Sequence, residues 1–299
     1  MSSNILFSFL GNEDITEKLA IKLNASVGQV LFRKFPDGES YVRILSDIKD
    51  KNVVLICTLH QPNDKFISLY FFSKTAKSLG VKTVCLVAPY LSYMRQDKIF
   101  HPGEGVTSKY FGELVSEFFD GIVTIDPHLH RVRSLSSVYS IPNMVLHAAQ
   151  EISKWIELNV SDPVLIGPDE ESKNWVSLVA KNANAPFIIL NKTRYGDRKV
   201  KIELPDLEMY NDKTPVLVDD IISTARTMIE VVENLKDTKM KAAIVIGIHA
   251  IFAGNAYQKL IDSGVGSIVT CNTIPHPTNE INISDELGKG IQQLLQKLN

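Results

Sequence analysis

The chain has 299 residues, which is enough for two domains of ordinary size, each with its own core. Hydrophobic residues make up 44% and charged residues 22%, as in soluble globular proteins, and the net charge of −2 excludes a general affinity for nucleic acid. The first residues lack the basic start of a signal peptide, and no apolar run is long enough to span a membrane. Three widely spaced cysteines lie in or beside apolar runs, as reduced core residues do, so we expect a cytoplasmic protein.

Strand and helix signals alternate through the first half. Apolar runs predict strands at 5–10, 30–32, 53–57, 83–88 and 122–125. Apolar residues at helical spacing predict helices near 13–23, 64–79 and 106–118. This alternation predicts a mostly parallel sheet covered by helices on both faces.

The second half repeats this rhythm after a helix predicted at 144–158. Strands are expected at 164–166, 187–190, 199–204, 216–218, 242–249 and 267–271. Helices are expected near 172–183, 226–235 and 254–262. We therefore expect an α/β protein with domains at 1–145 and 146–283, packed together because no low-complexity linker separates them. A final helix within 284–299 is expected to cross back onto the first domain.

The segment 215–227 connects an apolar strand to a helix, a position at which α/β proteins bind ligands. Backbone N–H groups at a helix start attract anions, and the side chains of Ser223, Thr224 and Arg226 add donors. Asp219 and Asp220 are suited to sugar hydroxyls or a divalent metal. The segment predicts a site for a phosphorylated sugar. Alternatively, the acids only end a strand and the hydroxyls only cap a helix.

A turn at Phe35-Pro36-Asp37-Gly38-Glu39 exposes an aromatic ring beside two carboxylates. The ring can stack on a nucleobase, and the carboxylates can accept hydrogen bonds from an exocyclic amine such as that of adenine. An ordinary surface turn is the alternative.

Arg95 and Gln96 follow the strand predicted at 83–88. The arginine could clamp a polyphosphate, and the glutamine could contact a nucleotide edge or a ribose. A solvated charged loop explains the same residues equally well.

Two further strand ends carry candidate metal ligands. His128 and His130 follow the strand at 122–125 beside Asp126, so one imidazole could contact a metal–nucleotide complex, or the pair could be structural. Asp169 follows the strand at 164–166 and could bind Mg²⁺, or it could belong to an acidic helix start.

Lys192 and Arg194 lie in a polar, glycine-containing loop after the strand predicted at 187–190. Such a loop can close over a charged transition state, and the two cations would neutralise negative charge that develops on a transferred group.

These motifs occur in the order and at about the spacing found in ribose-phosphate pyrophosphokinases, and the chain resembles that family over almost its whole length. The segment Val-Asp-Asp-Ile-Ile-Ser-Thr-Ala-Arg-Thr at 218–227 is also similar to the phosphoribosyl-pyrophosphate loop of phosphoribosyltransferases. The resemblance implies two phosphoribosyltransferase-like domains, the first on the ATP side and the second on the ribose 5-phosphate side.

The resemblance also implies a role for each motif. The expected ATP-binding residues are Phe35, Asp37, Gly38, Glu39, Arg95 and Gln96. The expected ribose 5-phosphate-binding residues are Arg194, Asp219, Asp220, Ser223, Thr224, Ala225, Arg226 and Thr227. The expected metal-associated residues are His128 and Asp169, and the expected catalytic residues are Lys192 and Arg194.

The implied reaction is the Mg²⁺-dependent transfer of the pyrophosphoryl group of ATP to O1 of ribose 5-phosphate. Its products are 5-phosphoribosyl 1-pyrophosphate and AMP. In this family the residue that matches Phe35 often contacts the ATP bound by a neighbouring subunit. The resemblance therefore implies a homo-oligomer that is a dimer or a multiple of dimers.

Two departures from the family's commoner pattern keep alternatives open. Glu170-Glu171-Ser172 stands where paired glycines are usual, and Arg226 stands where the phosphate loop commonly has glycine. We expect Arg226 to restrict a backbone that needs an unusual conformation, which would affect substrate affinity more than the fold. The alternatives are an inactive nucleotide-binding regulatory homologue and a phosphoribosyltransferase that consumes phosphoribosyl pyrophosphate. The latter leaves the motifs of the first half without a role.

Overall fold

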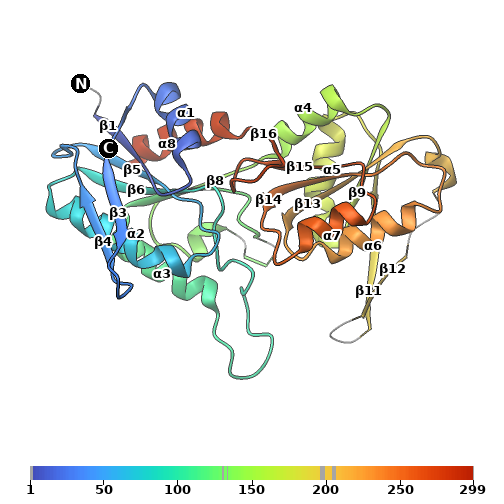
Figure 1. Cartoon of the computed structure of the whole chain (residues 1–299), viewed down its shortest axis with the longest axis horizontal. Coiled ribbons are helices and arrows are strands. Elements are labelled where there is room, and N and C mark those ends of the chain that lie inside the picture. Colours follow the sequence, from blue (N-terminus) through green and yellow to red (C-terminus); the bar gives the residue numbers. More distant parts are fainter. Residues whose placement is uncertain (1–2, 130, 133, 196–198, 204–206, 299) are drawn as a thin grey trace. The chain divides into compact units, whose positions relative to one another are not determined.

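The computed structural model describes residues 3–129, 131–132, 134–195, 199–203 and 207–298, with the backbone alone described for 191–195 and 199–203. Contacts divide the chain into two compact units (Figure 1). Unit 1 comprises Met1–His147 and Ser284–Asn299, and unit 2 comprises Ala148–Ile283. Each unit is an α/β layer structure, which confirms the predicted fold class.

A six-stranded parallel sheet forms the centre of unit 1, in the order β2-β1-β5-β6-β7-β8. Its strands are β1 (Asn4–Ser8), β2 (Ser26–Val27), β5 (Asn52–Ile56), β6 (Thr83–Ala88), β7 (Gly121–Ile125) and β8 (Asn143–Leu146). Every residue of β5, β6 and β7 is buried, because helices cover both faces of a parallel sheet.

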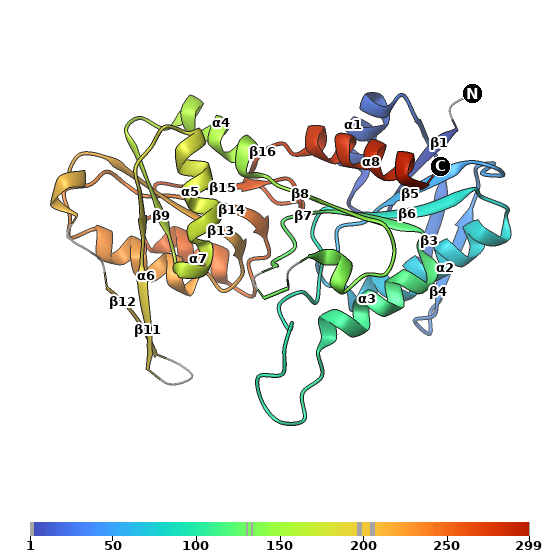
Figure 2. The same ribbon diagram turned by 180° about the vertical axis from the view of Figure 1, so that it is seen from behind.

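The helices of unit 1 are α1 (Glu13–Leu23), α2 (Asn63–Ser78), α3 (Thr107–Phe118) and α8 (Ser284–Leu298). Figures 1 and 2 show α1 and α8 on one face of the sheet and α2 and α3 on the other. The last helix contacts α1, β7 and β8, so the end of the chain completes the layer over its first half.

An antiparallel hairpin of β3 (Val30–Lys34) and β4 (Ser40–Ile44) leans on α2. The Phe32 ring lies 6.0 Å from that of Phe72 on α2 and 4.7 Å from that of Phe9, measured between ring centroids. The strand predicted at 30–32 therefore belongs to this hairpin and not to the parallel sheet. The turn at 35–39 forms its tip.

Unit 2 contains a second six-stranded parallel sheet, in the order β10-β9-β13-β14-β15-β16. Its strands are β9 (Pro163–Gly167), β10 (Phe187–Ile189), β13 (Thr214–Ile222), β14 (Ile244–Ala250), β15 (Ser267–Cys271) and β16 (Asn279–Ile281). The helices α4 (Ala149–Asn159) and α5 (Lys173–Asn182) contact each other, as do α6 (Arg226–Leu235) and α7 (Ala256–Asp262). Figure 2 shows the two pairs on opposite faces of the sheet.

A second antiparallel hairpin, β11 (Asn191–Tyr195) and β12 (Lys199–Glu203), lies outside this sheet and contacts α6 through β12. The strand predicted at 199–204 is therefore a hairpin strand, and residue 204 lies outside the described residues. The short 3₁₀ helices are η1 (Leu135–Ser137), η2 (Glu170–Ser172) and η3 (Glu208–Tyr210).

The helix predicted at 144–158 begins later than expected. Residues 143–146 form β8, which pairs with β7 with Ile125 opposite Leu146, and α4 starts at Ala149. The run Met144-Val145-Leu146 fits either a buried strand or a helix, and pairing with β7 decides in favour of the strand.

The three cysteines are buried thiols, as expected. Burial raises the pKa of Cys57 and of Cys85 to about 12, so neither thiol forms the reactive thiolate at neutral pH. Among the described helices, none combines the length and the apolar character needed to cross a bilayer.

Candidate active site

Two adjacent acids stand near the carboxyl end of β13, in the centre of the unit 2 sheet. Because β13 runs on to Ile222, Asp219 and Asp220 lie inside the strand and not after it. The Asp220 N–H donates to Asp219 Oδ1 at 3.0 Å. Burial, with the negative charges of Asp220 and Asp169, raises the pKa of Asp219 well above its usual value. The predicted carboxyl groups of Asp169, Asp219 and Asp220 thus interact electrostatically. A bound cation would reduce the repulsion between them.

Asp169 also has the structural role that the sequence left open. Its side-chain Oδ1 accepts a hydrogen bond from the Ser172 N–H at 3.2 Å, which caps η2. The Ser172 hydroxyl donates to the Asp169 carbonyl at 2.6 Å. Beside it, a Cβ added to Gly167 would lie 2.7 Å from both Ile189 Cδ1 and Ser172 Oγ, so a larger residue would displace the serine that the cap uses. The cap holds the Asp169 side chain in place.

The segment 223–227 follows β13 and leads into α6 as predicted. Ala225 precedes the helix with φ 56° and ψ 10°, a left-handed conformation, and Arg226 is the first helical residue. The expectation for Arg226 was therefore wrong, since the unusual backbone lies one residue earlier. An alanine has no polar group with which to cap α6, so the first-turn N–H groups suit an anionic ligand. Thr224 and Arg226 are exposed beside them.

A neighbouring loop that the sequence did not single out holds the start of this segment. The N–H of Phe252 donates to the Ile222 carbonyl at 2.9 Å, and the N–H of Ala253 donates to the Ser223 carbonyl at 3.0 Å. Backbone hydrogen bonds between two loops leave no residue pattern, so no sequence signal could have revealed them.

In unit 1, Asp126 and His147 are the first residues after β7 and β8. Parallel pairing places them side by side, and His147 Nδ1 lies 2.6 Å from Asp126 Oδ1. This hydrogen bond raises the pKa of His147 above its usual value. His147 was not predicted as a site residue, because the apolar pattern around it predicts a helix at 144–158. Knowing that β8 neighbours β7 would have revealed the pair.

His128 lies in a tight turn after β7. Asp126 and His128 have φ values of 35° and 54°, and the His128 N–H donates to the Asp126 carbonyl at 2.9 Å. Aspartate and histidine tolerate positive φ better than most residues, which fits them to this turn. His130 lies outside the described residues.

The loop after β6 carries Arg95 and Gln96. Arg95 is exposed, whereas Gln96 is tied to the start of α3: its Oε1 accepts from the Thr107 hydroxyl at 3.0 Å. Next to it, Asp97 Oδ1 lies 3.5 Å from an Arg131 guanidinium nitrogen. The other Asp97 oxygen is buried with no hydrogen-bond partner in the described part of the chain. The loop is thus anchored around Gln96, and Arg95 lies exposed beside this anchor.

At the tip of the β3–β4 hairpin, the Phe35 ring is 38% exposed. The Arg33 guanidinium carbon lies 4.3 Å from the Phe35 ring centroid and 4.2 Å from that of Tyr41. The Asp37 side chain accepts from the Glu39 N–H at 3.2 Å, which fixes the turn. The predicted aromatic ring and carboxylates therefore share one exposed turn, with an unpredicted arginine beside the ring.

Lys192 and Arg194 lie on β11, opposite Ile202 and Val200 of β12. They therefore belong to a hairpin strand and not to an open loop, and residues 196–198 at its tip lie outside the described residues. The side chains of both residues also fall outside the described part. Among the described residues, no cluster of three or more His, Cys, Asp or Glu side chains has metal-binding geometry.

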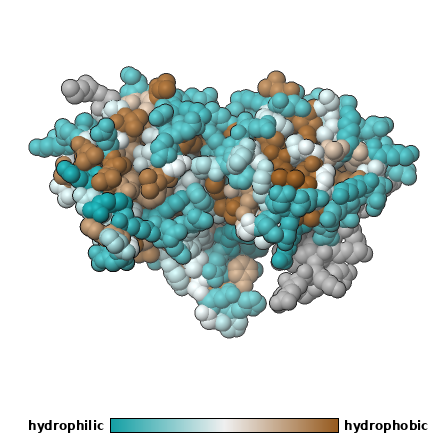
Figure 3. Space-filling model, viewed as in Figure 1, coloured by the Kyte–Doolittle hydropathy of each residue, from teal (hydrophilic) through white to brown (hydrophobic). Residues whose placement is uncertain are grey.

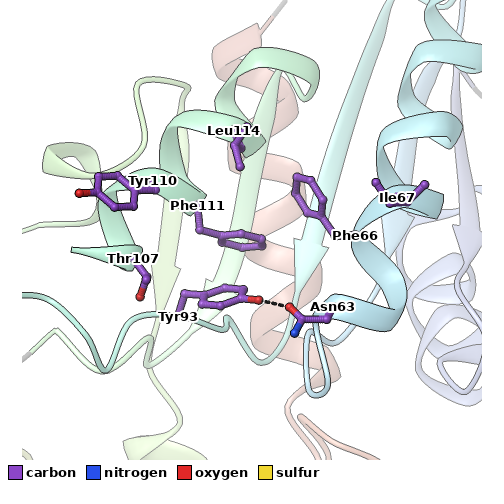
Figure 4. A pocket seen from close by; sticks show the side chains of 8 residues that line it. All are labelled: Asn63, Phe66, Ile67, Tyr93, Thr107, Tyr110, Phe111 and Leu114. Carbon is purple, nitrogen blue, oxygen red and sulfur yellow. Dashed lines mark hydrogen bonds between the residues drawn. The ribbon is translucent and has the colours of Figure 1, made fainter. Parts of the chain in front are cut away.

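A cleft of about 310 Å³ opens between α2 and α3 in unit 1 (Figure 4). Its walls are mostly apolar, and Tyr93 and Asn63 form a hydrogen bond at one end. The lining residues are Asn63, Phe66, Ile67, Tyr93, Thr107, Tyr110, Phe111 and Leu114. Figure 3 shows hydrophobic surface over unit 1. On α2, Ile67, Tyr70 and Phe71 have exposed side chains. None of the predicted site residues whose side chains the structure describes lines the cleft, although Thr107 on its wall donates to Gln96.

Two family models together match most of the chain. The N-terminal domain of ribose phosphate pyrophosphokinase matches residues 4–118, and the phosphoribosyl transferase domain matches residues 134–285. The ribose-phosphate pyrophosphokinase of Sulfurisphaera tokodaii is 31% identical over 286 residues, covering 94% of this chain and 97% of the relative. That of Methanopyrus kandleri is 30% identical over 280 residues, covering 93% and 94%.

The phosphoribosylpyrophosphate synthetase of Mycobacterium smegmatis has a similar structure, with a TM-score of 0.84. The alignment covers 98% of this chain and 99% of that chain at 22% sequence identity, which shows the shared fold. The family models and the relatives that match almost the full length of the chain agree with the fold and with the order of the motifs. The chain therefore belongs to the ribose-phosphate pyrophosphokinase family.

Proposed function

We propose that the protein transfers the β,γ-pyrophosphoryl group of ATP to O1 of ribose 5-phosphate with the help of Mg²⁺, producing 5-phosphoribosyl 1-pyrophosphate and AMP. One observation carries the proposal beyond family membership. In unit 2, the adjacent carboxyl groups of Asp219 and Asp220 lie near the end of β13, and a short segment connects this strand to α6. The residue before α6, Ala225, provides no side-chain cap. Carboxylates suit sugar hydroxyls, and an uncapped helix start suits a phosphate.

We assign ribose 5-phosphate to unit 2. Asp219 and Asp220 accept hydrogen bonds from the ribose hydroxyls, and the segment 223–227 binds the 5-phosphate with backbone N–H groups and hydroxyls. Arg226 adds a positive charge at the first helical position. Alanine at 225 permits this arrangement at the cost of a left-handed backbone.

Mg²⁺ is the metal we assign to this chemistry. The carboxyl oxygens of unit 2 are hard ligands of the kind that Mg²⁺ prefers. Burial, followed by the negative charges of Asp220 and Asp169, raises the pKa of Asp219, and a divalent cation would neutralise those charges. His128 and Asp169 are the proposed metal-associated residues, with Asp169 held by its cap on η2. When bound, Mg²⁺ neutralises charge on the polyphosphate.

We assign ATP to unit 1. Phe35 offers a ring for adenine, Asp37 and Glu39 offer acceptors at the same turn, and Arg95 offers a cation for the phosphates. Gln96 orients the loop through its bond to Thr107. Gly38, at the same hairpin tip, has φ 95° and lets the turn form.

The reaction is an in-line displacement at the β-phosphorus. A bond forms between O1 of the sugar and the β-phosphorus, the bond from the β-phosphorus to the α–β bridging oxygen breaks, AMP leaves, and the O1 proton is released. Lys192 and Arg194 neutralise the charge that spreads over the transferred group. No covalent intermediate with the protein is required, because positioning and charge neutralisation supply the acceleration.

The exposed position of Phe35 on a projecting hairpin supports its use by a neighbouring subunit, so we propose a homo-oligomer built from dimers. Buried thiols and a substrate such as ATP support a cytoplasmic location.

The test measures AMP formed from ATP and Mg²⁺ with and without ribose 5-phosphate. AMP that depends on the sugar phosphate supports the proposal. Lys192→Ala is expected to lower the rate by about 10²–10³, as loss of one transition-state donor does. Lys201→Ala, on the paired strand of the same hairpin, is the matched control and is expected to retain the rate. ATP binding without sugar-dependent AMP would instead identify an inactive regulatory homologue.

A further inference from the structure

The phosphate-binding segment of unit 2 begins beside the loop 251–255, which connects β14 to α7. The N–H groups of Phe252 and Ala253 donate to the carbonyls of Ile222 and Ser223, the last residue of β13 and the first of the segment. These hydrogen bonds fix where the segment leaves the sheet. The position of the segment therefore depends on the conformation of residues 252 and 253.

Phe252 has φ 41°, the left-handed region. For a bulky side chain this is a strained conformation, which persists only where the surroundings hold it. The chain turns sharply just before, where the Ile251 N–H donates to the His249 carbonyl at 3.1 Å. Something must therefore hold Phe252 in this conformation.

An aromatic cluster of Phe252, Tyr257 and His276 supplies this restraint. The buried Phe252 ring lies 5.3 Å from the Tyr257 ring, and it lies 4.7 Å from the His276 ring at an interplanar angle of 35°. The Tyr257 and His276 rings are 4.9 Å apart and nearly perpendicular. Each ring thus contacts the other two, and the cluster holds the strained residue by its side chain.

The cluster is anchored to the sheet through His276. Its Nδ1 accepts from the Thr278 N–H at 3.3 Å and lies 2.8 Å from the Thr278 hydroxyl. That hydroxyl in turn lies 2.8 Å from the hydroxyl of Thr270 on β15. A continuous set of contacts thus runs from β15 through the three rings to the carbonyls at the start of the phosphate-binding segment.

We propose that Phe252, held by Tyr257 and His276, is a positioning residue that sets the affinity of this segment for the phosphate of ribose 5-phosphate. The inference rests on the proposed function, because it takes the segment 223–227 as the 5-phosphate site. Phe252 acts through the backbone and its ring does not touch the ligand. Without the ring, residue 252 can leave its left-handed conformation. The hydrogen bonds from residues 252 and 253 then shift the carbonyls of Ile222 and Ser223.

The test uses Phe252→Ala and His276→Ala, each of which removes one ring of the cluster. His276→Phe keeps a ring at that position but loses the bonds to Thr278, so it separates ring packing from the anchor. Asn184→Gly is the matched control, because Asn184 is another positive-φ residue of unit 2, in the turn after α5. Readouts are KM for each substrate, kcat, and direct binding of ribose 5-phosphate by calorimetry. Thermal unfolding checks that each variant is folded.

Both alanine variants are expected to weaken ribose 5-phosphate binding and to raise its KM by about tenfold or more, since loss of one well-aligned hydrogen bond to a charged group has an effect of this size. KM for ATP is expected to change less than about twofold, as expected for an effect confined to one substrate. Asn184→Gly is expected to bind the sugar phosphate like the wild type. His276→Phe is expected to bind it more tightly than His276→Ala, because the ring packing is restored, but less tightly than the wild type, because the bonds to Thr278 are lost. Should Phe252→Ala fail to fold, His276→Ala alone carries the same expectation.

Folded alanine variants that bind ribose 5-phosphate as tightly as the wild type overturn the proposal, as does an equal rise in KM for both substrates. A wild-type protein that binds ribose 5-phosphate but forms no AMP refutes the proposed reaction only, and the binding comparison still decides the role of Phe252. Absence of any ribose 5-phosphate binding by the wild type overturns both.

Discussion

Leu294→Ala tests how far the last helix stabilises unit 1. Leu294 is 1% exposed in α8, which contacts β7 and β8. Its two Cδ atoms lie 3.0 Å from the position that a Cβ on Gly121 of β7 would occupy. The leucine thus fills the space above a glycine, and truncation leaves a cavity that no side chain at position 121 can fill.

The expected cost follows from this geometry. Buried Leu→Ala substitutions cost about 3–5 kcal/mol, and the larger values occur where the surroundings cannot collapse into the cavity. Because the cavity would be bounded by the strand backbone at Gly121, which cannot move into it, we expect Leu294→Ala to lower the free energy of unfolding by about 4 kcal/mol. At about 2–4 °C per kcal/mol for a domain of this size, unfolding of unit 1 shifts down by about 8–16 °C.

The assay follows the two units separately. Trp155 and Trp175 both lie in unit 2, so tryptophan fluorescence reports on that unit. Hydrogen exchange of peptides from β7 and β8 reports on unit 1. Gln293→Ala changes the exposed neighbour on the same helix and is expected to stay within about 0.5 kcal/mol. A loss in Leu294→Ala no larger than in this control would refute the claim that α8 is an integral part of unit 1.

Three further outcomes follow from the sites. Because the pKa of Asp219 is raised in the folded state, its contribution to stability is present below the unfolded pKa of 3.8 and is lost as pH rises through the folded pKa. Asp219→Asn should therefore stabilise the protein increasingly as pH rises above 3.8 in urea titrations, while abolishing activity. Arg226→Gly should lower the free energy of unfolding by up to about 1 kcal/mol, because it places glycine in α6. Ala225→Gly should be nearly neutral, because glycine adopts the left-handed backbone without strain, and this gain offsets the loss of a buried methyl group. Because the pKa of His147 is raised in the folded state, its contribution to stability is full below pH 6.5 and is lost as pH rises through the folded pKa. The His147 side chain is largely exposed, so this contribution is about 0.5 kcal/mol or less. His147→Gln should remove this part of the pH dependence of stability.

The strands that the sequence predicted well are those buried on both faces. The runs at 53–57 and 83–88 are continuously apolar and correspond to β5 and β6 to within one residue. The strand β8 was missed because its three apolar residues run directly into an amphipathic helix. Short strands such as β16 lack enough residues to show a period, and only their partners define them.

The candidate site shows the same division. Alternation of strands and helices was enough to predict that Asp169 and Asp219 lie near the carboxyl ends of strands in one sheet, and their charges do interact. The helix predicted at 226–235 matches α6, but the left-handed residue before it is Ala225 and not Arg226. That expectation came from the glycine that the family commonly has at 226, and a family pattern does not show which residue carries the positive φ. The contacts of Phe252 depend on which loops are neighbours, a property of the whole sheet order.

The order of elements along the chain has a consequence for how the protein is made. Unit 2 is inserted between β8 and α8 of unit 1, so the ribosome completes unit 2 before it releases the helix that covers β7 and β8. Until α8 emerges, the nascent chain exposes the surface around Gly121 and Leu146 on which Leu294 and Gly290 later rest. A ribosome stalled near residue 283 would therefore present an incomplete first unit to chaperones and proteases. In this protein the first unit to begin folding is the last to be finished.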